Sequence, residues 1–238
     1  FSESGTYPLE IYVEDYNGNS KIYTSDELEY LGYTYELVVE INNPSLCNEE
    51  TEVELWDECY NIEETTNINL NHNQLIGSIP SEIGNLINLN YLSLYNNNLT
   101  GSIPSEIGNL INLTHLILGY NGLTGSIPSE IGTLQDLMVL NINNNNLTGL
   151  IPSEIGDLTN LTELNLSNNP FDGNIPEVIG DLINLEQLIL YNNHLSGNIP
   201  FEIGNLINLL SLDLHNNQLS GDIPPDLGNL TNLTSLRL

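Results

Sequence analysis

Three side chains in the last third of the chain could in principle support catalysis or hold a metal ion: His194, Asp213 and His215. An imidazole beside a carboxylate is a common general-base pair, and two imidazoles with one carboxylate can bind zinc. However, the three residues occupy different positions of the sequence repeat described below, and nothing in their spacing makes the side chains converge. The sequence has no G-x-S-x-G turn, phosphate-binding loop or H-E-x-x-H motif. We therefore predict no catalytic residue, no metal site and no cofactor.

The same residues fit a surface for molecular recognition. Aromatic side chains mixed with isolated exposed aliphatic ones are typical of the energetic centres of interfaces. One such group, called here the N-terminal cluster, contains Tyr91, Tyr95, His115, Ile117 and Tyr120. The other, the C-terminal cluster, contains Gln187, Ile189, Tyr191, His194, Asp213 and His215. We favour the C-terminal cluster because it combines apolar, aromatic and charged groups. The alternative is that near-identical repeats scatter tyrosines without selection for binding.

A sequence repeat of fixed length positions these side chains. The pair Ile103-Pro104 recurs as Ile79-Pro80 one period earlier and as Ile127-Pro128 one period later, and the series continues along the chain without an insertion. Self-similarity at such a period predicts a solenoid, in which each unit buries its apolar residues against its neighbours. Within one unit, Leu92 and Leu94 flank Ser93. This alternation predicts a short strand with the leucines inward and Ser93 outward. Stacked in parallel, these strands would form a sheet on one face of the coil.

The turn after each predicted strand carries an asparagine, which we expect to bond backbone groups of its own coil and of a neighbouring coil. These structural asparagines are Asn73, Asn97, Asn121, Asn145, Asn169, Asn193 and Asn217. Gly101 suits a tight backbone bend. The segment from Pro104 to Gly108 predicts one helical turn, begun by the proline, favoured by Glu106 at its positive end and ended by the glycine.

Two further positions of the repeat are regular. Acidic residues at one of them could gather cations, although the helix-end role explains each of them individually. These residues are Glu82, Glu106, Glu130, Glu154, Glu202 and Asp226. Hydroxyl groups at the other could match an ordered lattice such as ice, or a polysaccharide. These residues are Thr100, Thr124, Thr148, Ser196 and Ser220.

Charge excludes two classes of partner. Lys21 and Arg237 are the only basic residues and face 32 acidic ones, which gives a formal net charge of −30. Nucleic acid and anionic membrane surfaces repel such a polyanion, so neither is expected as a partner. No apolar run approaches the roughly 18 residues that span a bilayer, so we expect no membrane insertion in this segment.

Residues before the repeats divide into two parts. Residues 1–46 are predicted to form a β-rich segment with strands near Leu9 to Val13 and Tyr33 to Ile41, joined by a polar connection from Asp15 to Ser25. Residues 47–66 contain Cys47, Trp56 and Cys59, and we expect them to cap the apolar end of the first coil. In an oxidising compartment the cysteines would form a disulfide worth about 3 kcal/mol, whereas in a reducing cell they would be free thiols.

The unit LxxLxxLxLxxNxLxGxIPxxIGxL resembles the leucine-rich repeat in the 24-residue subtype of plant receptor-like proteins. The resemblance covers residues 67–238 as seven complete repeats and a truncated eighth. It implies an α/β repeat solenoid that is curved, with a parallel β-sheet on the concave face and short helical turns on the convex side. The near absence of lysine and arginine also resembles secreted bacterial or environmental relatives.

The resemblance further implies recognition of a peptide or protein outside the cell or at the cell surface. We therefore expect a non-catalytic module that binds such a ligand on its concave face. One alternative is an adhesive or structural array that binds carbohydrate, ice or cations along a regular edge. Another is a spacer within a longer surface protein.

Overall fold

The computed structural model describes residues 10–14, 20–24, 47–48 and 50–238. The chain divides into two compact units, Phe1–Pro44 and Ser45–Leu238. In the first unit, β1 (Glu10–Glu14) pairs antiparallel with β2 (Ser20–Thr24). The first of these strands overlaps a predicted one. The second lies within the segment expected to be a polar connection, so that expectation was wrong.

The missed strand β2 has a simple explanation in the sequence. Ile22, Tyr23 and Thr24 are β-branched or aromatic residues that favour strands, and Asn17-Gly18 is a hairpin signal between the two runs. The other predicted strand, from Tyr33 to Ile41, lies outside the described residues.

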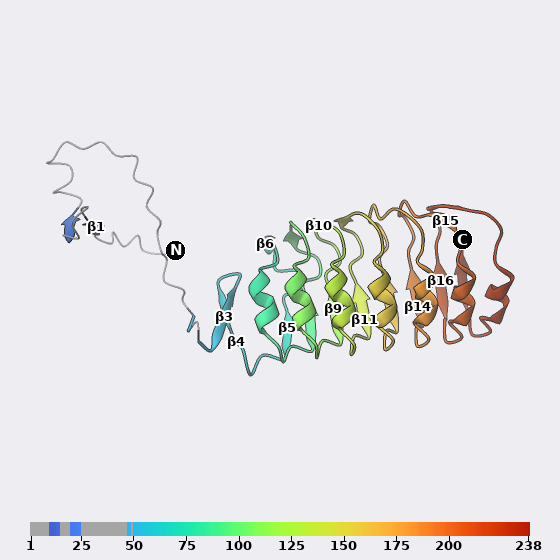
Figure 1. Ribbon diagram of the computed structural model, residues 1–238, viewed down its shortest axis with the longest axis horizontal. Helices are drawn as coiled ribbons and strands as arrows, with labels where there is room; N and C mark the ends of the chain where they lie inside the picture. The colour runs from blue at the N-terminus through green and yellow to red at the C-terminus, as the bar shows by residue number, and fades with distance from the viewer. Residues whose placement is uncertain (1–9, 15–19, 25–46, 49) are drawn as a thin grey trace. The chain divides into compact units, whose positions relative to one another are not determined.

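The second unit is a stack of coils that contributes one strand per coil to a parallel sheet of eight strands, as predicted (Figure 1). Each strand pairs with its counterparts one repeat period before and after it, so Leu140 lies opposite Leu116 and Leu164. The strands in sheet order are β5 (Asn67–Asn69), β7 (Tyr91–Ser93), β9 (His115–Ile117), β11 (Val139–Asn141), β13 (Glu163–Asn165), β14 (Gln187–Ile189), β16 (Ser211–Asp213) and β18 (Ser235–Arg237).

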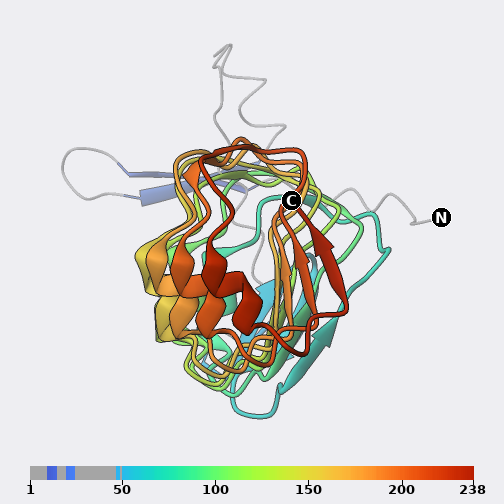
Figure 2. The ribbon, with the colours of Figure 1, turned by 90° about the vertical axis from the view of Figure 1, so that its right-hand side faces the viewer.

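Short 3-10 helices form a row on the side of the coils opposite the sheet (Figure 2). They are η1 (Ser81–Asn85), η2 (Ser105–Asn109), η3 (Ser129–Thr133), η4 (Ser153–Asp157), η5 (Glu177–Asp181), η6 (Phe201–Asn205) and η7 (Pro225–Asn229). We call the face of the sheet turned away from these helices the concave face. The predicted solenoid with a sheet on one side and helical turns on the other is therefore confirmed.

The helices differ from the prediction in one detail. Pro104 precedes η2 with an extended backbone, and Gly108 lies inside the helix instead of ending it. A methyl group at Gly108 would lie 2.7 Å from the backbone oxygen of Glu130 in the next coil. This glycine is therefore required for close packing between coils. The bend glycine Gly101 does have the expected positive φ, at 73°.

Short strands lie where the coils leave the sheet and bend, and they pair in parallel with strands of a neighbouring coil. These strands are β6 (Ile76–Gly77), β8 (Asn98–Leu99), β10 (Thr124–Gly125), β12 (Asn146–Leu147), β15 (Ser196–Asn198) and β17 (Gln218–Ser220). β6 pairs with β8, β10 with β12, and β15 with β17. They hold successive bends in register and so position the residues at the edge of the concave face.

A continuous core of leucine and isoleucine fills the interior from Ile68 to Leu230. Phe171 takes the place of a leucine at one level and is fully buried. Each buried leucine or isoleucine contributes about 1.5–3 kcal/mol of transfer free energy. Because those side chains are shared between neighbouring coils, no single repeat has a core of its own.

A disulfide-linked hairpin covers the start of this core. β3 (Glu52–Leu55) and β4 (Glu58–Asn61) are antiparallel, and Val53 and Leu55 belong to the core. Trp56 and Asp57 form the turn between them with positive φ angles of 50° and 65°, as a two-residue hairpin turn requires.

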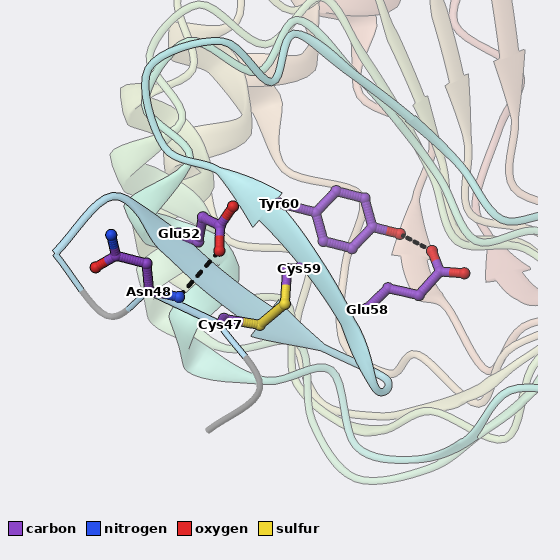
Figure 3. The surroundings of a disulfide bond; sticks show 6 residues. All are labelled: Cys47, Asn48, Glu52, Glu58, Cys59 and Tyr60. Carbon is purple, nitrogen blue, oxygen red and sulfur yellow. Dashed lines mark hydrogen bonds between the residues drawn. A yellow bond between two sulfur atoms is a disulfide. The ribbon is translucent and has the colours of Figure 1, made fainter. Parts of the chain in front are cut away.

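The disulfide joins Cys47 to Cys59 at the outer strand of this hairpin (Figure 3). Nearby, the Tyr60 hydroxyl donates a hydrogen bond of 2.9 Å to Glu58. Burial, this hydrogen bond and the negative charge of Glu58 raise the pKa of Tyr60 well above its ordinary value. The phenol therefore stays protonated. The only group of metal-ligand type found among the described residues is Cys47, Glu52 and Cys59, and the disulfide removes both thiolates from it.

Candidate binding surface

The asparagine of each turn holds the coils in register beneath the concave face. Asn145 is buried, and its amide nitrogen donates to the backbone oxygens of Leu118 and Ile142, each at 3.1 Å. Its side-chain oxygen accepts from the backbone nitrogen of Leu123 at 3.0 Å. Equivalent bonds are made by Asn97, Asn121, Asn169, Asn193 and Asn217. The side chain thus ties its own turn to the preceding coil.

Asn73 differs from the other members of this column because it lies in the first coil. Its side chain is exposed, and its backbone nitrogen donates to Asn97. The turn it occupies has no preceding repeat whose carbonyl groups it could satisfy.

The outward positions of the strands are more covered than alternation alone predicts. Ser93 is fully buried, because its hydroxyl donates to Asn71 at 2.6 Å and neighbouring side chains close over it. Asp213 is only 8% exposed for a similar reason. With strands about 4.8 Å apart, side chains of adjacent coils pack over the small residues between them. Outward position on the sheet therefore does not guarantee access to a ligand.

The C-terminal cluster is assembled from β14, β16 and the residues that follow them. The rings of Tyr191 and His215 stack at 4.9 Å between centroids, with 17° between their planes. His215 Nδ1 hydrogen-bonds the Asp213 carboxylate, which fixes the orientation of the imidazole. Ile189 is half-buried beside Asp213 on the neighbouring strand, and Gln187 is exposed at the strand start.

The structure adds one residue to this cluster and separates another from it. Arg237 on β18 approaches the Asp213 carboxylate to 3.7 Å. The sequence prediction omitted this residue, although Arg237 follows Asp213 by one period. His194 is exposed and lies beyond the buried Asn193, where the chain has left the sheet. Within the described residues, no hydrogen bond or ring contact joins the His194 side chain to the others.

The N-terminal cluster consists of two ring groups. Tyr91 and His115 contact each other at 5.5 Å between centroids at the strand starts. Tyr95 contacts Tyr120 at 5.2 Å on one side and His72 at 5.6 Å on the other. Ile117 is half-buried on β9. His72 was missed, although it lies two full periods before Tyr120 and therefore at the same position of the repeat.

The two regular edges are accounted for by the fold. An acidic residue lies in the first turn of every short helix, where Glu177 stands in for the interrupted position at Val178. In the hydroxyl column, Thr100 donates to the backbone oxygen of Gly77, and Ser196 to that of Gly173, each at 3.3 Å. The helix-end position accounts for the acidic column, and these backbone contacts account for the two hydroxyl groups.

The family assignment follows from this geometry together with sequence comparison. Residues 68–188 match the profile of a leucine-rich repeat region, and residues 184–206 and 208–230 match that of the leucine-rich repeat. The chain belongs to the leucine-rich repeat family. Within the family it is of the plant-receptor-like type, as the sequence motif indicated. A search among curated proteins gave no match.

Solved structures of similar fold include two plant receptors. One is the ectodomain of the membrane receptor kinase GASSHO1/SCHENGEN3 from Arabidopsis thaliana in complex with Casparian strip integrity factor 2. It is 42% identical, with a TM-score of 0.73, over 74% of this chain and 21% of that chain. The other is the plant peptide hormone receptor RGFR1 in complex with RGF2. It is 43% identical, with a TM-score of 0.69, over 70% of this chain and 27% of that chain.

A bacterial protein is also similar. A leucine-rich repeat protein of Leptospira interrogans is 38% identical, with a TM-score of 0.61, over 68% of this chain and 40% of that chain. This chain therefore spans less than half the length of each of these proteins. None of the helices in the described part of this chain is long and apolar enough to cross a membrane.

Proposed function

We propose that this chain is an extracellular recognition module that binds a peptide or protein ligand on its concave face and catalyses no reaction. Two similar solved structures are plant receptors in complexes with Casparian strip integrity factor 2 and RGF2. The Cys47–Cys59 disulfide is of a kind that persists in oxidising compartments, which supports a location outside the cell or at its surface.

The observation that carries the proposal is the stacked pair of Tyr191 and His215. Its two rings are held in place before any ligand arrives, because the Asp213 carboxylate orients the imidazole and Tyr191 lies over it. Binding to such a surface loses little side-chain entropy. With Ile189 nearby, the rings offer an apolar and aromatic platform for a side chain of the ligand. The formal charge of −30 attracts a ligand with basic residues.

A selection from a displayed library of random peptides tests this proposal. The bait is the wild-type protein, and the same selection is made with the triple variant Tyr191→Ala/Ile189→Ala/His215→Ala. The chain offers a matched control in the N-terminal cluster, Tyr91→Ala/Ile117→Ala/His115→Ala, which removes the same three residue types. Circular dichroism establishes that both variants are folded.

We expect peptides rich in basic residues to bind the wild type and the control, and to bind the first variant at least about tenfold more weakly. Equal binding to the first variant would contradict the C-terminal cluster as the site. Loss of binding only in the control would transfer the site to the N-terminal cluster. Failure to select any peptide would favour the spacer alternative over recognition.

A further inference from the structure

The third coil of the repeats departs from its neighbours at two positions on the edge of the concave face, one on each side of the structural Asn121. At the first, five other coils carry Asn96, Asn144, Asn168, Asn192 and Asn216 and the first coil carries His72, whereas this coil carries Tyr120. Asparagine tolerates the left-handed backbone of this position, but tyrosine does so at a cost in backbone strain. Tyr120 nevertheless has a φ of 57°. At the second position, Gly122 replaces the larger residues Asn98 and Asn146.

Side-chain amides at the first position form a partial ladder in the C-terminal coils. Asn192 Nδ2 donates to Asn168 Oδ1 at 2.6 Å, and Asn216 Nδ2 donates to Asn192 Oδ1 at 2.7 Å. By the same pattern Asn144 Nδ2 would donate to an amide oxygen at position 120, where tyrosine has none. This nitrogen is buried and has no hydrogen-bond partner among the described residues. A buried donor without a partner is unfavourable by about 1–3 kcal/mol unless something else satisfies it.

A pocket of about 420 Å³ opens at this place in the fold. It is lined by Asn96, Asn97, Asn98, Thr100, Tyr120, Asn121, Gly122 and Asn144. The lining combines one exposed aromatic ring, several amides and one hydroxyl group, and none of its side chains carries a charge. Gly122 has no side chain, whereas Asn98 and Asn146 stand at the equivalent position of their own coils. A methyl group at Gly122 would lie 3.2 Å from the backbone oxygen of Leu99.

We propose that this pocket is a binding site for a neutral saccharide. The ring of Tyr120, which is 46% exposed, can lie against the apolar C–H face of a pyranose. The amides of Asn96 and Asn98 each offer a donor and an acceptor to neighbouring hydroxyl groups. The uncharged lining and the acidic protein disfavour a negatively charged sugar. A peptide fits less well, because no aliphatic side chain lines the pocket.

Two unfavourable features coincide at this place in the fold. Tyrosine in a left-handed conformation and an unsatisfied amide donor both disappear if residue 120 is asparagine, as in the neighbouring coils. The substitution Tyr120→Asn should therefore raise the melting temperature while it removes the aromatic platform. Gly122→Asn fills the pocket with a side chain that Asn98 and Asn146 already place at equivalent positions.

The experiment uses protein made in bacteria, so that the Asn98-Leu99-Thr100 glycosylation sequence carries no attached sugar that could occupy the pocket. Saturation-transfer NMR and titrations are made with cellotetraose, mannotetraose and galactotetraose, and with tetragalacturonate as the charged comparator. The control is Tyr191→Asn, which makes the same chemical change in the C-terminal cluster.

We expect at least one neutral tetrasaccharide to bind the wild type and Tyr191→Asn with equal affinity. Binding to Tyr120→Asn and Gly122→Asn should be at least about tenfold weaker, although both variants remain folded. Binding of none of the neutral sugars, or equal binding to Tyr120→Asn, would overturn the proposal. Loss of the selected peptides in Tyr120→Asn without any sugar binding would also overturn it and assign the position to the peptide surface. The peptide proposal does not depend on this result.

Discussion

Among single residues, the asparagine of each turn has the most clearly defined role. Its amide hydrogen-bonds backbone groups in two coils that would otherwise be buried without partners. The side chain therefore stabilises the fold and is not available to bind a ligand. Asn145 shows the arrangement in the middle of the stack, where it is 7% exposed. The residues that differ from coil to coil, such as Tyr120 and Tyr191, are therefore the candidates for binding a ligand.

Replacing Asn145 by alanine should lower the free energy of unfolding by about 3 kcal/mol, because the Leu123 nitrogen and the two buried carbonyl groups lose their partners. Chemical denaturation followed by circular dichroism measures the change. The matched control is Asn73→Ala, whose side chain makes no hydrogen bond to the described residues and should change stability by less than about 0.5 kcal/mol. Similar losses in the two variants would contradict the proposed role.

At the scale of elements, the short helices are shaped by contact between coils more than by helix-ending signals. A methyl group at Gly132 in η3 would lie 2.8 Å from both the backbone oxygen and the Cβ of Glu154 in the next coil. Glycine at this position therefore sets how closely successive helices approach. In η7, the same position is Gly228, and an added methyl group there meets no atom within 4 Å.

The substitution Gly132→Ala should destabilise the protein by about 2 kcal/mol, because the backbones of two coils must move apart. Gly228→Ala is the control and should be neutral or slightly stabilising, since alanine has the higher helix propensity. Thermal unfolding of the two variants beside the wild type measures the difference. If Gly228→Ala were as destabilising as Gly132→Ala, the glycines would be needed for backbone conformation and not for packing between coils.

For the whole molecule, charge is the dominant feature. With 32 acidic and two basic residues, the folded chain concentrates negative charge that the unfolded chain spreads over a larger volume. Among the described residues, the Asp213 carboxylate lies 3.7 Å from the guanidinium of Arg237. Self-repulsion between the other carboxylates should therefore limit stability at low ionic strength.

Raising NaCl from 10 mM to 500 mM should increase the melting temperature by on the order of 5 °C, because the screening length falls from about 30 Å to less than 10 Å. Differential scanning calorimetry measures this shift. Sorbitol at the same osmolality is the control, since it screens no charge. A melting temperature unchanged by salt would show that the carboxylates are too far apart for their repulsion to matter.

Much of this protein could be predicted from the sequence because its fold is periodic. Leucines, asparagines and Ile-Pro pairs that recur once in every repeat specify one strand, one turn and one helix per coil, and stacking then follows from shared burial. The outward positions could be assigned in the same way, including those of Tyr191 and His215. Residues 1–46 have no repeat, so their prediction had only local alternation to use and missed β2.

Only the tertiary structure showed which outward-facing residues are accessible to solvent and which side chains of different coils contact each other. Ser93 and Asp213 are buried although their positions in the repeat face outward, because side chains of neighbouring coils close over them. The orphaned amide of Asn144 arises from Tyr120, which occupies the same position of the preceding coil. Contacts of this kind depend on pairs of side chains in different coils. The repeat determines the backbone that all coils share. The burial and the partners of a residue that differs from the repeat depend on the side chains of the adjacent coils.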